Sequence, residues 1–261
     1  MVDAMQTVIL CGGKGTRLSE ETVLRPKPMV PVGRHPILWH IMKYYGSYGF
    51  KDFTLATGHM GDYIKNYFLH YAELNSDFEV DLSNGKVTAL QRGSKEDWKV
   101  RLIDTGPESM TGGRLLRLKS YMRETFFLTY GDGVCDVDLE ELLRFHKKHG
   151  KLVTMTAVRP SARFGGLEIH DDGSIKMFRE KLPTDEQFIN GGFMVMEPGV
   201  FEYLENDQTI LERQPMEKLA KEGQLMAFQH EGFWQCMDTI RDRELLEDYW
   251  SSNRAPWKRW E

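Results

Sequence analysis

Cysteine is scarce in this chain, and its three cysteines do not form the pattern of a cross-link or a metal site. Cys11, Cys135 and Cys236 are far apart, odd in number and never form a CxxC pair. Such usage gives no support to a disulfide framework or a zinc site, and it is typical of proteins in a reducing cytoplasm. The eight histidines include no pair at metal-ligand spacing beside a glutamate.

Long apolar runs and clustered basic residues are also missing. No uninterrupted apolar stretch approaches the ~18 residues of a membrane span, and residues 1–10 lack the pattern of a signal peptide. The net charge is -5, and lysine and arginine are spread along the chain rather than gathered in a stripe. We therefore expect neither a membrane nor a nucleic acid as a partner.

The first half of the chain alternates strand-like with helix-like patterns. The predicted strands are 7–11, 53–57, 100–105 and 125–132, and the predicted helices are 36–49, 61–74, 113–122 and 138–150. Asn84-Gly85 predicts a hairpin turn inside the polar stretch 75–99. Strands that alternate with helices indicate an α/β fold with a Rossmann-like, doubly wound, mixed but mainly parallel sheet.

The pattern changes after about residue 150. Strands are predicted at 152–158 and 188–197, and a hairpin is predicted around Asp172-Gly173. We interpret this section as a smaller β-rich lobe at the edge of the sheet. Residues 239–253 predict a final helix that packs back on the body.

The stretch "VILCGGKGTRL" (8–18) places three glycines and a threonine directly after a strand. Gly12, Gly13 and Gly15 allow a turn whose N–H groups point one way, while Arg17 adds a permanently charged fork. The pattern is neither a P-loop nor GxGxxG, since no GK[ST] follows and Leu18 holds the third glycine position. A tight turn with a solvated arginine is the alternative, and we favour a phosphate-binding loop.

Three further charged residues lie in positions that suit a phosphate site. Lys27 is fixed between Pro26 and Pro28, which favours a phosphate clamp as much as a solvated loop lysine. Asp132 ends a strand in "YGDGV", where it could hold Mg²⁺ or simply shape a turn. Asp238 precedes a predicted helix, so N-capping is its alternative role.

"MFREKL" (177–182) places Glu180 beside Lys181. At a strand end or bulge both side chains could face a ligand, the lysine toward phosphate and the glutamate toward sugar hydroxyls. Judged alone, an exposed charged edge strand is the stronger interpretation.

Taken in order, "GGKGTRL", "PKPM", "YGD", "FREK", "NGG" and "FWQCMDT" resemble the sugar-phosphate nucleotidyltransferase family, also called nucleoside-diphosphate-sugar pyrophosphorylases. The resemblance runs from about Thr7 to the C-terminus. Stretches such as "DTGPESMTGGRL" and "INGGFMV" are similar to the branch that transfers a cytidylyl group to glucose 1-phosphate. Relatives that use dTTP or UTP typically carry a PxGLAQA-like or related segment where this chain has "SMTGGRLLR", which favours CTP.

The resemblance implies a reaction of CTP with α-D-glucose 1-phosphate that yields CDP-glucose and pyrophosphate. It implies Mg²⁺ as cofactor, held by Asp132 and Asp238, and catalytic roles for Arg17, Lys27 and Asp132. The implied nucleotide-binding residues are Leu10, Gly12, Gly13, Lys14, Gly15, Thr16, Arg17, Lys27, Thr111, Gly112 and Gly131. The implied sugar-phosphate-binding residues are Gly165, Gly166, Glu180, Lys181 and Asn190.

The resemblance also implies one domain in three parts and a homo-oligomer, with a hexamer suggested. The parts are a nucleotide-binding core (5–150), a sugar-phosphate-binding part (151–238) and a C-terminal helix and tail (239–261). The alternatives are a UTP- or dTTP-dependent relative and a catalytically silent regulatory member of the family. The presence of Arg17, Lys27, Asp132, Lys181 and Asp238 argues against a silent member. A Rossmann dehydrogenase comes third, because the glycine spacing does not fit.

Overall fold

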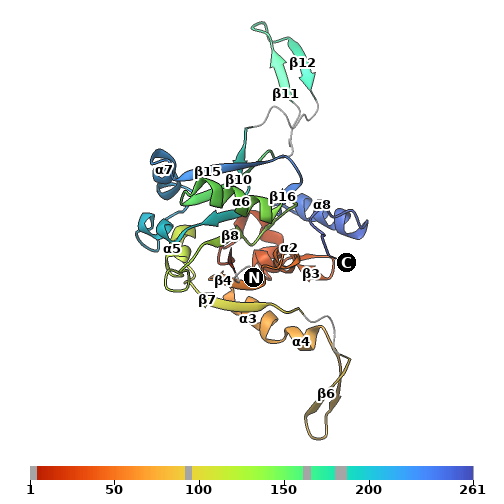
Figure 1. Ribbon diagram of the computed structural model, residues 1–261. Helices are drawn as coiled ribbons and strands as arrows, with labels where there is room; N and C mark the ends of the chain where they lie inside the picture. Colours follow the sequence, from red (N-terminus) through yellow and green to blue (C-terminus); the bar gives the residue numbers. More distant parts are fainter. Residues whose placement is uncertain (1–4, 92–95, 161–165, 180–186, 261) are drawn as a thin grey trace.

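A mixed, mainly parallel sheet forms the centre of the molecule (Figure 1). A computed structural model describes residues 5–91, 96–160, 166–179 and 187–260. The strands of the central sheet are β1 (Gln6–Leu10), β4 (Asp52–Thr57), β7 (Lys99–Asp104), β8 (Phe126–Tyr130), β10 (Val153–Val158), β13 (Ile189–Asn190), β14 (Met194–Met196) and β15 (Leu225–His230). Their order is β13-β10-β14-β8-β1-β4-β7, and β15 also pairs with β10. The predicted fold class is confirmed.

Strand direction divides the sheet into two parts. β8, β1, β4 and β7 are parallel neighbours, as the alternation of strands and helices predicts. β14 is antiparallel to both β8 and β10, while β15 is parallel to β10. The strands after residue 150 therefore extend the central sheet itself, and the hairpin of β11 (Gly166–Ile169) and β12 (Ile175–Arg179) projects from its edge (Figure 1).

Successive residues of each buried strand point to opposite sides of the sheet, so the strands contribute to two hydrophobic clusters, one on each face. Ile9 and Phe127 belong to one core cluster, whereas Val8 and Leu128 belong to the other. The helices that supply residues to the first cluster are α2 (Ile37–Ser47), α3 (Gly61–Leu69), α6 (Leu139–His149) and α8 (Ile240–Ser251). Those of the second are α5 (Thr111–Leu116) and α7 (Gln214–Lys221).

Three predicted elements have different limits in the structure. The helix predicted at 113–122 is wrong in extent: α5 ends at Leu116, and the chain continues to Tyr121 through i→i+3 turns. The helix predicted at 61–74 is divided at His70 into α3 and α4 (Tyr71–Leu74). The strand predicted at 188–197 is broken between β13 and β14, where Gly192 and Phe193 have positive φ.

The remaining short elements connect these layers. Two of them follow the three glycines directly: the 3-10 helix η1 (Thr16–Leu18) and α1 (Ser19–Thr22). Others are η2 (Lys27–Met29), the β2 (Pro31–Val32) and β3 (His35–Pro36) pair, and η4 (Pro198–Tyr203). β9 (Gly133–Cys135) pairs with β16 (Trp234–Cys236), and β5 (Asp77–Asp81) with β6 (Lys86–Gln91) around the predicted Asn84-Gly85 turn. None of the described helices has the length and apolar character needed to cross a membrane.

The predicted C-terminal helix does pack back, and the tail after it closes over a buried histidine. His40 is fully buried on α2, and its Nε2–H donates to the carbonyl of Val32 at 2.9 Å. Its Nδ1 accepts the indole N–H of Trp257 at 3.3 Å. The ring is therefore neutral with Nδ1 unprotonated, and burial lowers the pKa of His40 to about 4.

We predict that His40 makes the fold sensitive to mild acid. The pKa of His40 is about 4 in the folded chain and 6.5 in the unfolded chain. Between these two values the unfolded chain binds the proton more strongly, so the free energy of unfolding falls as the pH drops from 6.5 toward 4. From pH 7 to pH 5 the loss from this group is about 2 kcal/mol. Urea unfolding at both pH values would measure it, with His40→Gln as reference. If wild type and variant lost the same amount, His40 would not be the responsible group.

Candidate active site

A cavity of about 790 Å³ opens at the carboxyl ends of β1 and β8. These strands are parallel neighbours, and Leu10 lies opposite Tyr130 at their ends. The segments that contribute lining residues are 10–16, 27–28, 109–114, 129–133, 189–193 and 234–238, together with Pro160 and Glu212. Ligands of open α/β sheets bind at such strand ends, so this cavity is the candidate active site.

The glycine-rich segment forms one wall of the cavity. Gly12, Gly13, Gly15 and Thr16 line it, and Gly15 has a φ of 62°, which glycine adopts without strain. No described residue accepts a hydrogen bond from the backbone N–H of Gly13, Lys14 or Gly15. Successive N–H groups in a turn that includes a left-handed residue can form a concave site for anionic oxygens. The geometry thus agrees with the phosphate-binding interpretation of this stretch.

A buried arginine supports this wall from below. Arg114 on α5 is 4% exposed, and its guanidinium donates to the carbonyl oxygens of Gly12 and Gly106, both at 2.7 Å. It also donates to the hydroxyl of Thr105 at 3.0 Å. Burial lowers the pKa of Arg114, and the nearby acids oppose that effect, with Asp104 the strongest of them. The arginine therefore fixes the start of the glycine-rich segment and places a positive charge beneath it.

Two aspartates far apart in sequence meet on the opposite wall. Asp132 immediately precedes β9, and a single residue, Met237, separates the end of β16 from Asp238. The antiparallel register of these strands pairs Gly133 with Cys236, and the backbone N–H of Met237 donates to the carbonyl of Asp132 at 2.8 Å. The β9–β16 ladder thus holds both carboxylates at the same end.

Lys27 lies between the two aspartates. Its Nζ is 2.7 Å from Oδ2 of Asp132 and 2.5 Å from Oδ1 of Asp238, and its side chain is 11% exposed. Burial alone would lower the pKa of Lys27, but attraction and hydrogen bonding from both aspartates outweigh it and raise the pKa above 10.5. Its stabilising contribution is therefore complete at neutral pH and is lost only as pH rises through that raised value.

The position of Lys27 also tests whether a divalent cation fits here. The ammonium group of Lys27 occupies the place that a divalent cation would take, and one carboxylate oxygen from each aspartate lies within 2.7 Å of it. Oxygen-only donors of this kind suit a hard cation such as Mg²⁺. Asp238 is also released from helix capping, because Thr239 caps α8 in a capping box with Asp242. The residues therefore fit a cation, provided that Lys27 moves aside.

A hydrogen-bonded set of polar side chains forms a further part of the lining. Glu212 accepts from the hydroxyl of Tyr130 through Oε1 and from that of Thr111 through Oε2, each at 2.6 Å. Asn190 Nδ2 donates to the Tyr130 hydroxyl at 3.2 Å. Burial and the nearby Glu212 carboxylate raise the pKa of Tyr130 well above 10. This network connects the segment around Thr111 with the strand that carries Asn190.

Most of the sequence-predicted site residues line this one cavity. They are Leu10, Gly12, Gly13, Gly15, Thr16, Lys27, Thr111, Gly131, Asp132, Asn190 and Asp238. Two others are not among the lining residues: Lys14 forms an exposed ion pair with Glu108, and Gly112 packs against Thr209. For Arg17 and Gly166 the structure describes the backbone alone, within η1 and β11. Gly165, Glu180 and Lys181 lie outside the described residues.

Among the lining residues that the sequence analysis did not name are Tyr130, Arg114 and Glu212, whose polar side chains form hydrogen bonds at the site. Tyr130 directly precedes Gly131-Asp132 at a strand end, so the reasoning applied to Asp132 could have found it. Arg114 and Glu212 carry no such signal. An arginine on a short helix normally faces solvent, and Glu212 lies in a turn that only the tertiary fold brings to the cavity.

Comparison with known proteins agrees with the geometry. The nucleotidyl transferase family model matches residues 6–251. Glucose-1-phosphate cytidylyltransferase of Salmonella typhimurium (strain LT2) is 49% identical over 98% of this chain and 100% of its own length. A Bacillus subtilis (strain 168) protein named "Probable glucose-1-phosphate cytidylyltransferase" is 43% identical over 98% and 100% of the two chains. The crystal structure of HddC from Yersinia pseudotuberculosis has a similar fold, with a TM-score of 0.69, 22% identity, and coverage of 94% of this chain and 99% of that one.

We predict that Lys27→Met lowers stability and creates a stronger cation site. Without the ammonium group the carboxylates of Asp132 and Asp238 face each other uncompensated, which costs on the order of 3 kcal/mol. Added Mn²⁺ or Mg²⁺ should restore the melting temperature of the variant and should raise that of the wild type much less. Calorimetric titration with Mn²⁺ in the absence of nucleotide would show tighter binding to the variant.

Lys43→Met is the matched control, because Lys43 pairs with Glu96 outside the cavity. It should leave Mn²⁺ binding as in the wild type. Equal Mn²⁺ affinity in Lys27→Met and the wild type would show that Lys27 does not compete with the cation.

Proposed function

Because this chain belongs to the nucleotidyl transferase family, we propose that it converts CTP and α-D-glucose 1-phosphate to CDP-glucose and pyrophosphate. One observation carries the chemistry: a glycine-rich segment with unused N–H groups and a pair of aspartates bridged by Lys27 line the same cavity. The substrates are taken from the relatives at 49% and 43% identity, whose names specify glucose 1-phosphate and cytidylyl transfer.

The proposed reaction is a single displacement at phosphorus. An oxygen of the sugar phosphate forms a bond to the α-phosphorus of CTP, and the bond from that phosphorus to the β-phosphate oxygen breaks. Pyrophosphate leaves on the opposite side with the electron pair. Both phosphates are anionic, so the protein has no proton to transfer, and catalysis is alignment with charge neutralisation.

Different residues of the chain are proposed to bind the phosphates and to neutralise their charge. The N–H groups of residues 13–15 hold the triphosphate, and Arg114 adds its positive charge beneath them. Lys27 turns from the aspartates to the phosphates as negative charge develops on the leaving group. A divalent cation, which we propose to be Mg²⁺, neutralises phosphate charge when bound between Asp132 and Asp238. Arg17 is proposed as a second phosphate ligand.

The base and the sugar are proposed to lie on either side of the phosphates. Thr111 and Gly112 are proposed to lie near cytosine, whose amino group distinguishes it from uracil and thymine. The glucose 1-phosphate is proposed to contact Gly165, Gly166, Glu180, Lys181 and Asn190. Asn190 is the member of this set that the cavity lining includes among the described side chains.

The experiment for this proposal is a nucleotide panel. Purified protein is incubated with Mg²⁺, glucose 1-phosphate and one of CTP, UTP, dTTP, ATP or GTP, and pyrophosphate release is measured. We expect kcat/KM for CTP to be at least tenfold above the other four. Asp132→Asn controls for contaminating activity and should lower kcat/KM by about 10²-fold or more. Equal turnover with UTP or dTTP would refute CTP selectivity, and no turnover with any nucleotide would refute the proposed activity.

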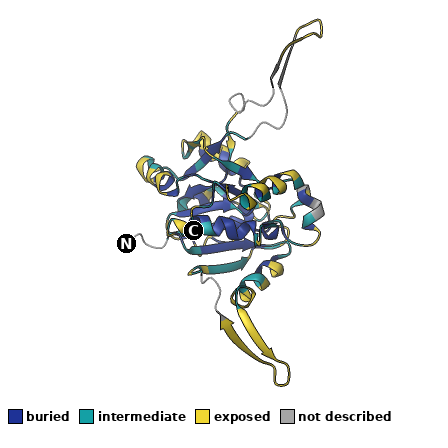
Figure 2. Cartoon of the chain, turned by 90° about the vertical axis from the view of Figure 1, so that its right-hand side faces the viewer, coloured by how far each residue is buried: buried dark blue, intermediate teal, exposed yellow. Residues whose placement is uncertain are grey.

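We also propose that the protein forms a homo-oligomer through the β5–β6 hairpin. Its register places Phe78 opposite Ala89 and Val80 opposite Val87, so one face is apolar, while Glu79, Asp81 and Lys86 occupy the other. Phe78, Val80 and Val87 are 47%, 42% and 59% exposed. The hairpin projects from the body and is exposed along its length (Figure 2). An isolated hairpin is marginally stable in water, so a second copy of this chain is a fitting partner for the apolar face.

We predict that Val80→Asp with Val87→Asp dissociates the oligomer. Two carboxylates on the apolar face would have to be desolvated on association, which costs several kcal/mol. Sedimentation velocity would show a smaller species than the wild type, whose assembly should be a hexamer if the family resemblance holds. Glu79→Gln with Thr88→Asp on the polar face is the control and should leave assembly intact. A monomeric wild type would refute the proposal.

A further inference from the structure

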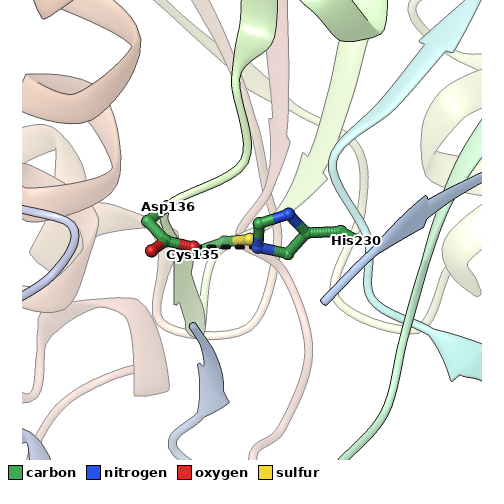
Figure 3. Close-up of side chains that lie close together, drawn as sticks. All are labelled: Cys135, Asp136 and His230. Atoms are coloured by element: carbon green, nitrogen blue, oxygen red, sulfur yellow. Dashed lines mark hydrogen bonds and ion pairs between the residues drawn. The ribbon is translucent and has the colours of Figure 1, made fainter. Parts of the chain in front are cut away.

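A second cluster of metal-ligating side chains lies outside the active site, at the far end of the β9–β16 ladder. Sγ of Cys135, a carboxylate oxygen of Asp136 and a ring nitrogen of His230 lie within 4.8 Å of one another. Figure 3 shows the three side chains converging from two segments of the chain, with a hydrogen bond between the histidine and the aspartate. None of the three is needed for the proposed reaction.

The donor atoms face a common point. Nε2 of His230 is 2.8 Å from Oδ1 of Asp136 and 3.3 Å from the carbonyl oxygen of Phe233. That carbonyl also accepts the backbone N–H of Asp136 at 3.1 Å, so it is held beside the cluster. With the Phe233 carbonyl the cluster offers one sulfur, one nitrogen and two oxygens, and four is the number of donors that a tetrahedral cation takes.

The backbone closes around this position. A Cβ atom added at Gly232 would lie 2.5 Å from Oδ1 of Asp136 and 2.9 Å from Nε2 of His230. Glycine at this position therefore lets the backbone pass close to the two donor atoms, where any side chain would collide with them. The cysteine is fully buried, whereas the side chain of Asp136 is 34% exposed and offers a route from solvent.

We propose that Cys135, Asp136 and His230 form a binding site for a borderline-soft divalent cation such as Zn²⁺, with the Phe233 carbonyl as the fourth donor. A thiolate and an imidazole select such a cation over Mg²⁺, whereas the oxygen-only pair Asp132 and Asp238 does the reverse. Thiolate and carboxylate together carry two negative charges, which the cation neutralises.

When the cation binds, each bond that forms replaces a bond that breaks, and each proton is accounted for. The Cys135 thiol releases its proton to solvent and the sulfur binds the cation as a thiolate. His230 would bind the cation through Nε2 as a neutral ring that carries its proton on Nδ1. The hydrogen bond between His230 and Asp136 is exchanged for two bonds to the cation. No oxidant or reductant takes part.

The site would act on the ladder that carries the active-site acids. Cys135 pairs with Trp234 at one end of the β9–β16 ladder, and Asp132 and Asp238 flank its other end. A cation that joins Cys135 and Asp136 to His230 and Phe233 would hold the two strands together. The proposed site is therefore structural, and its effect should be measured as binding and stability rather than turnover.

Cobalt substitution tests the proposal directly. Chelator-treated, reduced protein is titrated with Co²⁺ in excess Mg²⁺, which competes with Co²⁺ for the oxygen-only site. We expect one equivalent of Co²⁺ with a thiolate-to-cobalt charge-transfer band and tetrahedral d–d bands, all of which Zn²⁺ displaces. Saturating Zn²⁺ should also raise the melting temperature by roughly 5 °C. Absence of the charge-transfer band would overturn the proposal.

Variants assign the ligands. Cys135→Ala should abolish the charge-transfer band, and the matched control Cys236→Ala should retain it, although Cys236 lies 3.8 Å from Asp238. His230→Gln should weaken Co²⁺ binding at least roughly tenfold. A charge-transfer band that survives in Cys135→Ala and vanishes in Cys236→Ala would show that the cation binds at the active site, and it would refute the proposal. If Cys135→Ala does not fold, as judged by circular dichroism, the affinity of His230→Gln decides in its place.

Discussion

Two carboxylates held at one end of a two-stranded ladder are the constraint on which the rest of the site depends. β9 and β16 bring Asp132 and Asp238 together, and a carboxylate oxygen of each lies within 2.7 Å of one ammonium nitrogen. Two negative charges so close repel each other, and a cation between them offsets that repulsion. In the structure the ammonium group of Lys27 supplies that cation. In the proposed reaction the aspartates would hold a divalent cation in place of this ammonium group, which would leave Lys27 free to contact the phosphates.

The same ladder links the two proposed cation sites. Its active-site end presents oxygen donors alone, and its far end presents the sulfur of Cys135 and the nitrogen of His230. Ligand type is what separates hard from borderline cations, so the two ends need not compete for the same ion. Among the described strands β9 and β16 pair only with each other, and a cation at the proposed Cys135 site would add to the backbone hydrogen bonds that hold their register.

Features of the fold and site that depend on local sequence could be predicted, and those that depend on tertiary contacts could not. Buried strands and their ends follow from apolar runs, which is why Asp132 and the glycine-rich segment were identified. Lys27 was singled out because two prolines fix its backbone. The sequence analysis found no support for a zinc site because spacing rules recognise only local pairs, whereas Cys135 and His230 are 95 residues apart. Glu212 likewise reaches Thr111 through the fold alone.

The distribution of charge around the cavity favours a polyanion. Arg114 donates to the carbonyl oxygens of Gly12, Gly106 and Pro107 and to the Thr105 hydroxyl, all of them neutral acceptors. Its positive charge is thus fixed under the glycine-rich wall without a carboxylate in hydrogen-bond contact among the described residues. On the other wall Lys27 is neutralised by two acids. In the proposed reaction a triphosphate between these walls would meet a preorganised positive charge on one side. On the other side Lys27 would become available to it once Asp132 and Asp238 hold a divalent cation.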